Sequence, residues 1–236
     1  MTRELVYGRR PVREVLFGPR EVLELWASER AVRSEEWLGE VERPRVQTKL
    51  ERDLTEAAGT RDHQGVVAWC EPFRYADAFE LATGPAPLLA CLDQVSDPRN
   101  LGAVIRSAEG AGASGVVVPA HGSARVTAAV CRSSAGAVEH LPVAVVPNLA
   151  RYLAEIKSGD LWVAGAVGGS GTPMWVADLS GGIAFVFGAE GKGLRPLVRR
   201  TCDVHVSIPQ LGRVESLNVS VAAALLLYEA RRQRDV

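Results

Sequence analysis

The sequence lacks any long apolar run, since no stretch approaches the roughly 18 consecutive apolar residues that a membrane helix needs. Its 236 residues are 47% hydrophobic and 23% charged, as in an ordinary soluble globular protein, and a chain of this length can bury a core without staples. The first ten residues, MTRELVYGRR, carry charges where a secretory signal would be apolar. We therefore expect a cytoplasmic protein without a membrane segment.

Closely spaced cysteines are also missing. The chain has 4 cysteines, none forms a CxxC pair, and no histidine stands at ligand spacing from any of them. Disulfides and a metal site are therefore not expected. No repeat of 20–50 residues and no low-complexity tract is visible, which excludes a solenoid.

The chain has no excess of either charge, with a formal net charge of −1. This value does not by itself favour a nucleic-acid partner, because such affinity comes largely from neutralising phosphates with Lys and Arg. Arginine is nevertheless clustered, and each cluster is either a solvated helix face or a contact for an anionic partner. The clusters are Arg9, Arg10 and Arg13; Arg195, Arg199 and Arg200; and Arg231, Arg232 and Arg234.

The chain divides into a small and a large α/β unit. Residues 5–70 combine helical apolar spacing at 11–16 and 50–58 with strand-like runs at 22–26 and 66–69. Residues 71–87 lose this periodicity and gain prolines and a glycine, which is typical of a linker. We predict a small domain over 1–72, a linker over 73–86 and a larger domain over 87–236.

The larger domain alternates short apolar runs with helical patterns. Strands are expected at 88–92, 115–118, 143–146, 161–166, 183–187 and 204–208. Continuous apolar strands joined by helical crossovers indicate a mostly parallel sheet covered on both faces. The sequence therefore predicts a doubly wound α/β domain.

Two glycine patterns imitate nucleotide-binding motifs. Residues 110–115 match GxGxxG, but they follow a helical pattern and precede a strand, whereas the dinucleotide motif follows a strand and opens a helix. A nicotinamide-dependent oxidoreductase has no other support. Residues 188–193 resemble a phosphate loop but lack the first glycine and the final Ser or Thr of the Walker pattern.

Three segments place polar residues where a strand ends or a helix begins, which is where α/β folds bind ligands. After strand 88–92, a helix with one apolar face leaves Asn100 near its start and Arg106 on another face. Strand 183–187 runs into a glycine-rich turn that contains Glu190. The loop before the C-terminal helix holds Ser216, which suits an N-cap, and Asn218, a poor helix former among small apolar neighbours.

In order and spacing, these segments resemble the three motifs of the SpoU/TrmH family of SPOUT RNA 2'-O-ribose methyltransferases. Residues 5–8, LVYG, and 63–68, HQGVVA, look like the small, ribosomal-protein-like substrate-binding domain of the RlmB-like branch. The resemblance implies a C-terminal SPOUT domain with a deep trefoil knot, preceded by an RNA substrate-binding domain. It also implies a homodimer, with the apolar segment 219–228 as part of the contact.

The same resemblance implies S-adenosylmethionine as cofactor and requires no metal. Catalytic positions would be Asn100, Arg106, Glu190, Ser216 and Asn218. The cofactor would be held mainly through backbone groups at Gly165, Gly188, Gly191, Ile208, Leu217 and Asn218. We expect Glu190 to fix Arg106 or Asn100 by a hydrogen bond, and Arg9, Arg10 and Arg13 to contact RNA.

By resemblance to the branch, the substrate is a guanosine ribose in large-subunit (23S) ribosomal RNA. Transfer RNA and a resistance-type ribosomal adenosine remain alternatives, because base choice depends on contacts that motifs do not reveal. A non-catalytic ribosomal-RNA assembly factor is a further alternative, against which the intact set of motif residues argues.

Overall fold

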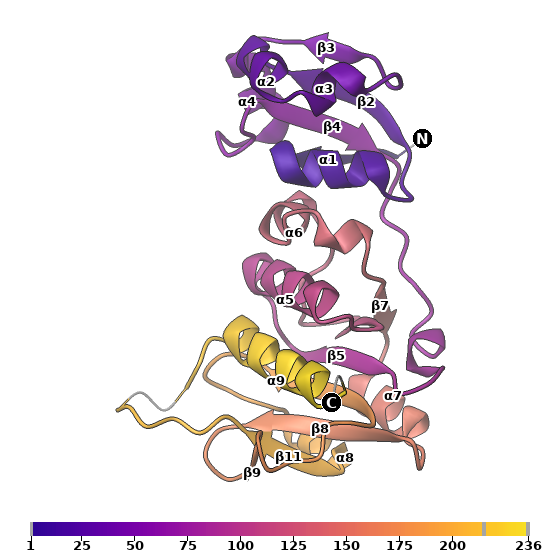
Figure 1. The fold of residues 1–236 in the computed structure, drawn as a ribbon, viewed down its shortest axis with the longest axis vertical. Coiled ribbons are helices and arrows are strands. Elements are labelled where there is room, and N and C mark those ends of the chain that lie inside the picture. Colours follow the sequence, from indigo (N-terminus) through magenta and orange to yellow (C-terminus); the bar gives the residue numbers. More distant parts are fainter. Residues whose placement is uncertain (1, 214–215, 235–236) are drawn as a thin grey trace. The chain divides into compact units, whose positions relative to one another are not determined.

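The computed structural model describes residues 2–213 and 216–234 and contains two compact units. The N-terminal unit comprises residues up to 74 together with 125–140, and the C-terminal unit comprises 75–124 and the chain from 141 onward. Each unit has its own sheet (Figure 1).

The N-terminal unit is built on a four-stranded sheet in the order β1-β4-β2-β3. β4 pairs antiparallel with both neighbours, and β2 pairs parallel with β3. Its strands are β1 (Glu4–Tyr7), β2 (Val22–Ala27), β3 (Val46–Thr48) and β4 (Val66–Cys70). Its helices are α1 (Arg9–Phe17), α2 (Glu29–Ser34), α3 (Trp37–Glu40), α4 (Glu51–Ala58), α6 (Ala128–Ser133) and η2 (Ala137–Glu139).

A buried ion pair joins residues 125–140 to the rest of this unit. The Nε of Arg20 donates to Oε2 of Glu139 at 2.9 Å, and its Nη2 donates to Oε1 of the same carboxylate. The two side chains are only 5% and 1% exposed. Arg20 also donates to Glu4 at 3.2 Å, and the same Glu4 oxygen accepts from the backbone N–H of Phe73 at 3.0 Å. Ordering of segment 125–140 is thus coupled to the core of the N-terminal unit.

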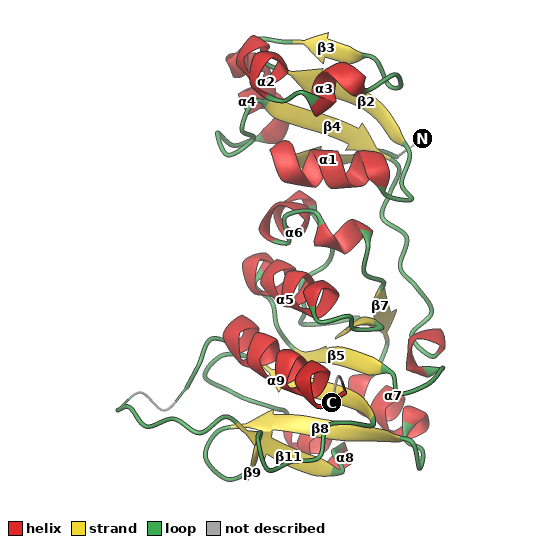
Figure 2. Ribbon diagram, viewed as in Figure 1, coloured by secondary structure: helices red, strands yellow, loops and turns green. Residues whose placement is uncertain are grey.

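The C-terminal unit is a seven-stranded sheet in the order β7-β6-β5-β10-β8-β11-β9, parallel throughout. Figure 2 shows its helices on both faces of the sheet. The strands are β5 (Leu88–Asp93), β6 (Gly115–Pro119), β7 (Val143–Val146), β8 (Leu161–Val167), β9 (Thr172–Pro173), β10 (Gly182–Gly188) and β11 (Val204–Ser207). The helices are η1 (Glu80–Ala82), α5 (Pro98–Gly110), α7 (Leu149–Ile156), α8 (Pro196–Thr201) and α9 (Val219–Arg234).

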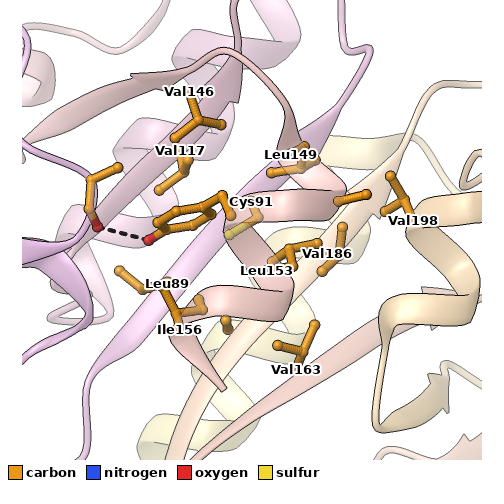
Figure 3. Close-up of a cluster of buried hydrophobic side chains, with 14 of the residues drawn as sticks. Leu89, Cys91, Val117, Val146, Leu149, Leu153, Ile156, Val163, Val186 and Val198 are labelled. Atoms are coloured by element: carbon orange, nitrogen blue, oxygen red, sulfur yellow. Dashed lines mark hydrogen bonds between the residues drawn. The ribbon is translucent and has the colours of Figure 1, made fainter. Parts of the chain in front are cut away.

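Each face of this sheet is covered by a different pair of helices. α7 packs against α8 and α5 packs against α9. On the α7 side, Ala184 and Val186 join a buried apolar cluster around Leu149 and Leu153, where the Tyr152 hydroxyl donates to the carbonyl of Ala78 at 2.8 Å (Figure 3). Because side chains alternate along a strand, Phe185 and Phe187 point to the α5 and α9 side. Both faces of the central strand, β10, are therefore buried away from solvent.

Local signals explain where α5 begins and ends. The Asp97 side chain accepts from the backbone N–H of Arg99 at 2.8 Å, and Pro98 occupies the first turn, where a missing N–H is harmless. The helix ends at Gly110, and Gly112 adopts a positive φ of 71° as the chain turns into β6. The GxGxxG letters therefore end a helix, as predicted.

The predicted doubly wound sheet is confirmed, and all six predicted strands are present within one or two residues. The strands β1, β3 and β9 were not predicted, and β3 and β9 carry no alternating or continuous apolar pattern. Part of segment 73–86, predicted as a linker, is packed: Ala76 donates to the carbonyl of Val143 at 2.9 Å, and Leu81 is buried. The predicted domain boundaries and the knot stay predictions.

Among the described residues, no helix has the length and apolarity to cross a membrane.

Breaking the Arg20–Glu139 pair should destabilise the N-terminal unit. Arg20→Met leaves the buried Glu139 carboxylate without its partner, which costs about 3–5 kcal/mol. Glu139→Leu should cost less, because Arg20 keeps its pair with Glu4, and the double variant should lie much closer to the unaltered protein. Hydrogen exchange of residues 2–74 in the full chain measures this. Single variants within about 0.5 kcal/mol of the unaltered protein, which is the usual range for surface substitutions, would show that the pair is not essential.

Candidate functional site

A cavity of about 250 Å³ opens at the carboxyl ends of β8, β10 and β11. The carboxyl edge of a parallel sheet is the usual ligand site of α/β folds. Most of the wall is backbone and apolar side chains, completed by the first turns of α9. Representative lining residues are Gly168, Gly188, Ile208, Ser216, Leu217 and Leu226.

Asn218 connects the three polar segments singled out from the sequence. Its Nδ2 donates to Oδ1 of Asn100 at 3.0 Å and to Oε1 of Glu190 at 2.6 Å. Its Oδ1 accepts from the backbone N–H of Ser220 at 2.8 Å and from the Ser220 hydroxyl at 2.6 Å. One carboxamide thus caps α9 and joins α5 to the turn after β10.

This arrangement corrects two sequence predictions. The cap of α9 is Asn218 and not Ser216, which lies earlier in the loop and lines the cavity. The predicted partner of Glu190 was Arg106 or Asn100, but the hydrogen-bond donor to its carboxylate is the Asn218 amide. Asparagine is a strong cap and a poor interior residue, which was the available signal.

The turn after β10 takes its shape from glycine. A Cβ at Gly188 would overlap the backbone of Gly193, and Gly191 and Gly193 adopt positive φ values of 73° and 65°. The Gly193 N–H donates to the carbonyl of Ala189 at 2.9 Å, which closes the turn. Larger residues would open it, and Glu190 would lose its position.

A buried carboxylate fixes the far end of the same turn. Asp93, the last residue of β5, is fully buried and accepts from the backbone N–H of Arg195 at 2.8 Å and from its Nε at 2.7 Å. Two charge-assisted bonds to one carboxylate hold residue 195 against the sheet. Asp93 was not predicted as a site residue, although an acid ending a buried apolar strand was the signal.

Of the remaining predicted site residues, some line the cavity and others do not. Gly191, Ile208 and Leu217 line the cavity. Gly165 does not: it pairs within the sheet, and the cavity lining begins at the next residue, Ala166. Arg106 is exposed on α5 and makes no hydrogen bond or ion pair with any described residue.

The C-terminal end of α9 is hydrogen-bonded to the segment that precedes β10. The Gln233 side chain accepts from the backbone N–H of Leu179 at 2.7 Å and donates to Ala177 at 3.1 Å. Hydrogen bonds from Arg232 and then Gln233 lower the pKa of Glu229 to about 2. Because both ends of α9 are fixed, Asn218 has little freedom to shift along the helix axis.

Two family models divide this chain between them. Residues 87–228 match the SpoU rRNA Methylase family, and residues 5–76 match the RNA 2'-O ribose methyltransferase substrate binding model. The chain belongs to the SpoU rRNA methylase family. The predicted SpoU/TrmH membership is therefore confirmed.

Two curated relatives in this family match over nearly the full length of both chains. The chain is 40% identical to a 23S rRNA (guanosine-2'-O-)-methyltransferase RlmB of Pseudomonas putida, over 99% of this chain and 98% of the relative. It is 36% identical to a putative TrmH family tRNA/rRNA methyltransferase of Bacillus subtilis, over 98% and 96%. A longer uncharacterized tRNA/rRNA methyltransferase of Synechocystis is also 36% identical, and the chain spans 63% of its length.

Solved structures of SpoU members share the architecture. The SpoU methyltransferase AviRb of Streptomyces viridochromogenes in complex with the cofactor AdoMet superimposes with a TM-score of 0.83 at 28% identity, over 99% of this chain and 91% of that one. An RNA 2'-O ribose methyltransferase superimposes with a TM-score of 0.82 at 29% identity, over 99% and 90%. The predicted SPOUT architecture with an N-terminal substrate-binding domain is thereby confirmed.

The two roles assigned to Asn218 can be separated by substitution. Asn218→Asp keeps the oxygen that caps α9 but removes both donors and places a second carboxylate beside Glu190. We expect methyl transfer to fall by about 100-fold, as for loss of a preorganised donor, while the thermal midpoint changes little.

Asn218→Ala is the matched control because it removes cap and donors together. It should lower the thermal midpoint as well, by an amount that corresponds to about 1 kcal/mol. Full methyl transfer by Asn218→Asp would show that the amide serves only as a cap.

Proposed function

We propose that the chain transfers a methyl group from S-adenosylmethionine to the ribose 2'-hydroxyl of a guanosine in large-subunit ribosomal RNA, in the cytoplasm. The observation that carries this proposal is the Asn100–Asn218–Glu190 hydrogen-bonded group at the edge of the cavity. The names of the RlmB relatives support guanosine of 23S rRNA as the substrate.

The cavity fits the proposed cofactor in its chemistry. Among the described residues that line it, Glu190 is the only charged one, and the apolar side chains of Ile208, Leu217 and Leu226 suit the faces of an adenine ring. An acid rather than a base at the edge is compatible with a cationic sulfonium. When bound, S-adenosylmethionine supplies a methyl group that its positive sulfur already activates.

The protein's task is then to position a ribose hydroxyl and to accept charge as its proton leaves. The C–S bond breaks as the O–C bond forms, and the hydroxyl proton passes to a phosphate or to water. In this proposal Asn100 and Asn218 orient the ribose, and the Ser216 hydroxyl, which lines the cavity, assists them. No metal is needed for this chemistry.

Arg106 acts in this proposal through its permanent charge. A guanidinium has a pKa above about 12 and holds its proton, so it is a poor base. Its exposed fork, which pairs with no residue in the described part of the chain, can instead bind a phosphate beside the target ribose and stabilise negative charge on the 2'-oxygen.

The N-terminal unit would read RNA shape and phosphates. Arg10 and Arg13 are exposed on α1, whereas Arg9 is held by Glu35 at 2.8 Å and by the Gln64 carbonyl at 3.1 Å. We therefore assign phosphate contacts mainly to Arg10 and Arg13. The proposed division is an RNA-binding domain over 1–72 and a methyltransferase domain over 87–236, joined by 73–86.

We also propose that the chain acts as a homodimer through α9. Val221, Leu225 and Tyr228 are 46%, 40% and 51% exposed and follow one another at helical spacing. An apolar stripe on the helix that carries Asn218 suits an isologous contact with a second copy.

The direct test of function is transfer of labelled methyl to ribosomal RNA that lacks modifications, followed by mapping of alkali-resistant ribose. One labelled guanosine is expected. Arg106→Ala should lower kcat by about 100-fold or more without changing the Kd for S-adenosylmethionine. Arg106→Lys keeps a charge but loses the fork, so nearly full activity of this variant would refute the bidentate role. No transfer to any RNA, with cofactor bound, would favour a non-catalytic RNA-binding protein.

Leu225→Arg should convert a dimer into a monomer, because a buried charge without a partner opposes association. Light scattering after size exclusion measures the mass. The matched control is Leu197→Arg on α8, which is 55% exposed outside the stripe and should leave the mass unchanged. A monomeric unaltered chain that is fully active would contradict the dimer proposal.

A further inference from the structure

A second, polar cavity adjoins the first at the hydrogen-bonded group. It has a volume of about 360 Å³, and it shares Ala189, Glu190 and Val219 with the cofactor cavity. The loop after β5 forms one wall, and Gly122 and Lys192 complete it. A ligand here and a cofactor in the first cavity would meet beside Asn100 and Glu190.

The loop after β5 holds Gln94 in a conformation that glutamine rarely adopts. Its φ is 63°, in the left-handed region, which costs a non-glycine residue about 1 kcal/mol or more. The neighbours on both sides impose it: Asp93 is fixed by Arg195, and the Val95 carbonyl accepts from Ala124 at 2.9 Å. Such strain persists only where the surroundings determine it, and it concentrates at functional sites.

The Gln94 side chain lies against Gly122 and has no hydrogen-bond partner among the described residues. A Cβ built on Gly122 would lie 3.1 Å from its Nε2 and 3.5 Å from its Cγ, so the amide lies beside Gly122, whose positive φ of 77° favours glycine. Neither this amide nor the exposed ammonium of Lys192 hydrogen-bonds to any residue among 2–213 and 216–234. Both groups remain available to a ligand.

The chemistry of the acceptor indicates what enters this cavity. Carbon 2' of a ribose has two ring neighbours, of which one carries the base and the other a phosphate. With the cofactor in the first cavity, the base beside the reacting hydroxyl needs a cavity of its own that reaches the same hydrogen-bonded group. RNA enzymes and sequence-specific RNA-binding proteins commonly receive such a base splayed out of its stack.

We propose that this second cavity binds the base of the nucleotide that is methylated, with Gln94 as a specificity-determining residue. Its amide offers one acceptor and two donors, which matches the mixed edge of a purine, and Lys192 contacts the adjoining phosphate. This inference rests on the proposed function and adds to it the groups that select the base.

The test uses Gln94→Gly in the full chain, because glycine keeps the positive φ and removes only the side chain. The substrates are RNAs with guanosine, inosine or adenosine at the methylated position. Loss of one or two hydrogen bonds should lower kcat/KM for guanosine by about 10- to 100-fold and bring the guanosine-to-adenosine ratio towards one. The Kd for S-adenosylmethionine should not change.

Two further variants distinguish base reading by Gln94 from a general effect of backbone strain and from phosphate binding. Ala86→Gly relieves a different positive-φ residue, which is exposed and has a φ of 49°, and should leave the ratio unchanged. Lys192→Gln should raise KM for RNA without altering the ratio. An unchanged ratio and rate in Gln94→Gly would overturn the base-reading role while leaving the methyltransferase proposal intact. Absence of transfer by the unaltered chain would overturn both.

Discussion

The hydrogen bonds of one carboxamide determine how the candidate site is assembled. Asn218 and Asn100 are 118 residues apart in the chain, yet the amide of the first donates to the oxygen of the second and to Glu190. The oxygen of the same amide begins α9. Because one planar group serves both purposes, the direction of α9 and the position of the polar group cannot vary independently.

The surrounding structure keeps that group in place. The buried Asp93 carboxylate at the end of β5 is hydrogen-bonded to Arg195. The glycine turn after β10 brings Glu190 within hydrogen-bonding distance of Asn218 at the start of α9. At the other end of α9, Gln233 is bonded to residues 177 and 179. Polar groups that are held from several directions lose little further freedom when a ligand binds, which is the physical meaning of preorganisation.

Patterning predicted the fold well because the sheet is buried on both faces. Continuous apolar strands and glycine-ended helices are strong local signals, and they located all six longer strands of the C-terminal unit. Contacts between distant segments could not be predicted in this way. That Glu190 bonds to Asn218 depends on tertiary placement, whereas the cap of α9 is a local contact between Asn218 and Ser220. The motif resemblance supplied the site residues, and the structure supplied the partners of Asn100, Glu190 and Asn218.

The discontinuous N-terminal unit has a consequence for synthesis on the ribosome. Domains usually fold in order as the chain emerges, at roughly 5–20 residues per second. Here Arg20 can pair with Glu4 early, but its buried partner Glu139 is made only 119 residues later. During that interval β5 and β6 of the C-terminal unit are also synthesised, so the N-terminal unit cannot finish folding until part of the other unit has emerged.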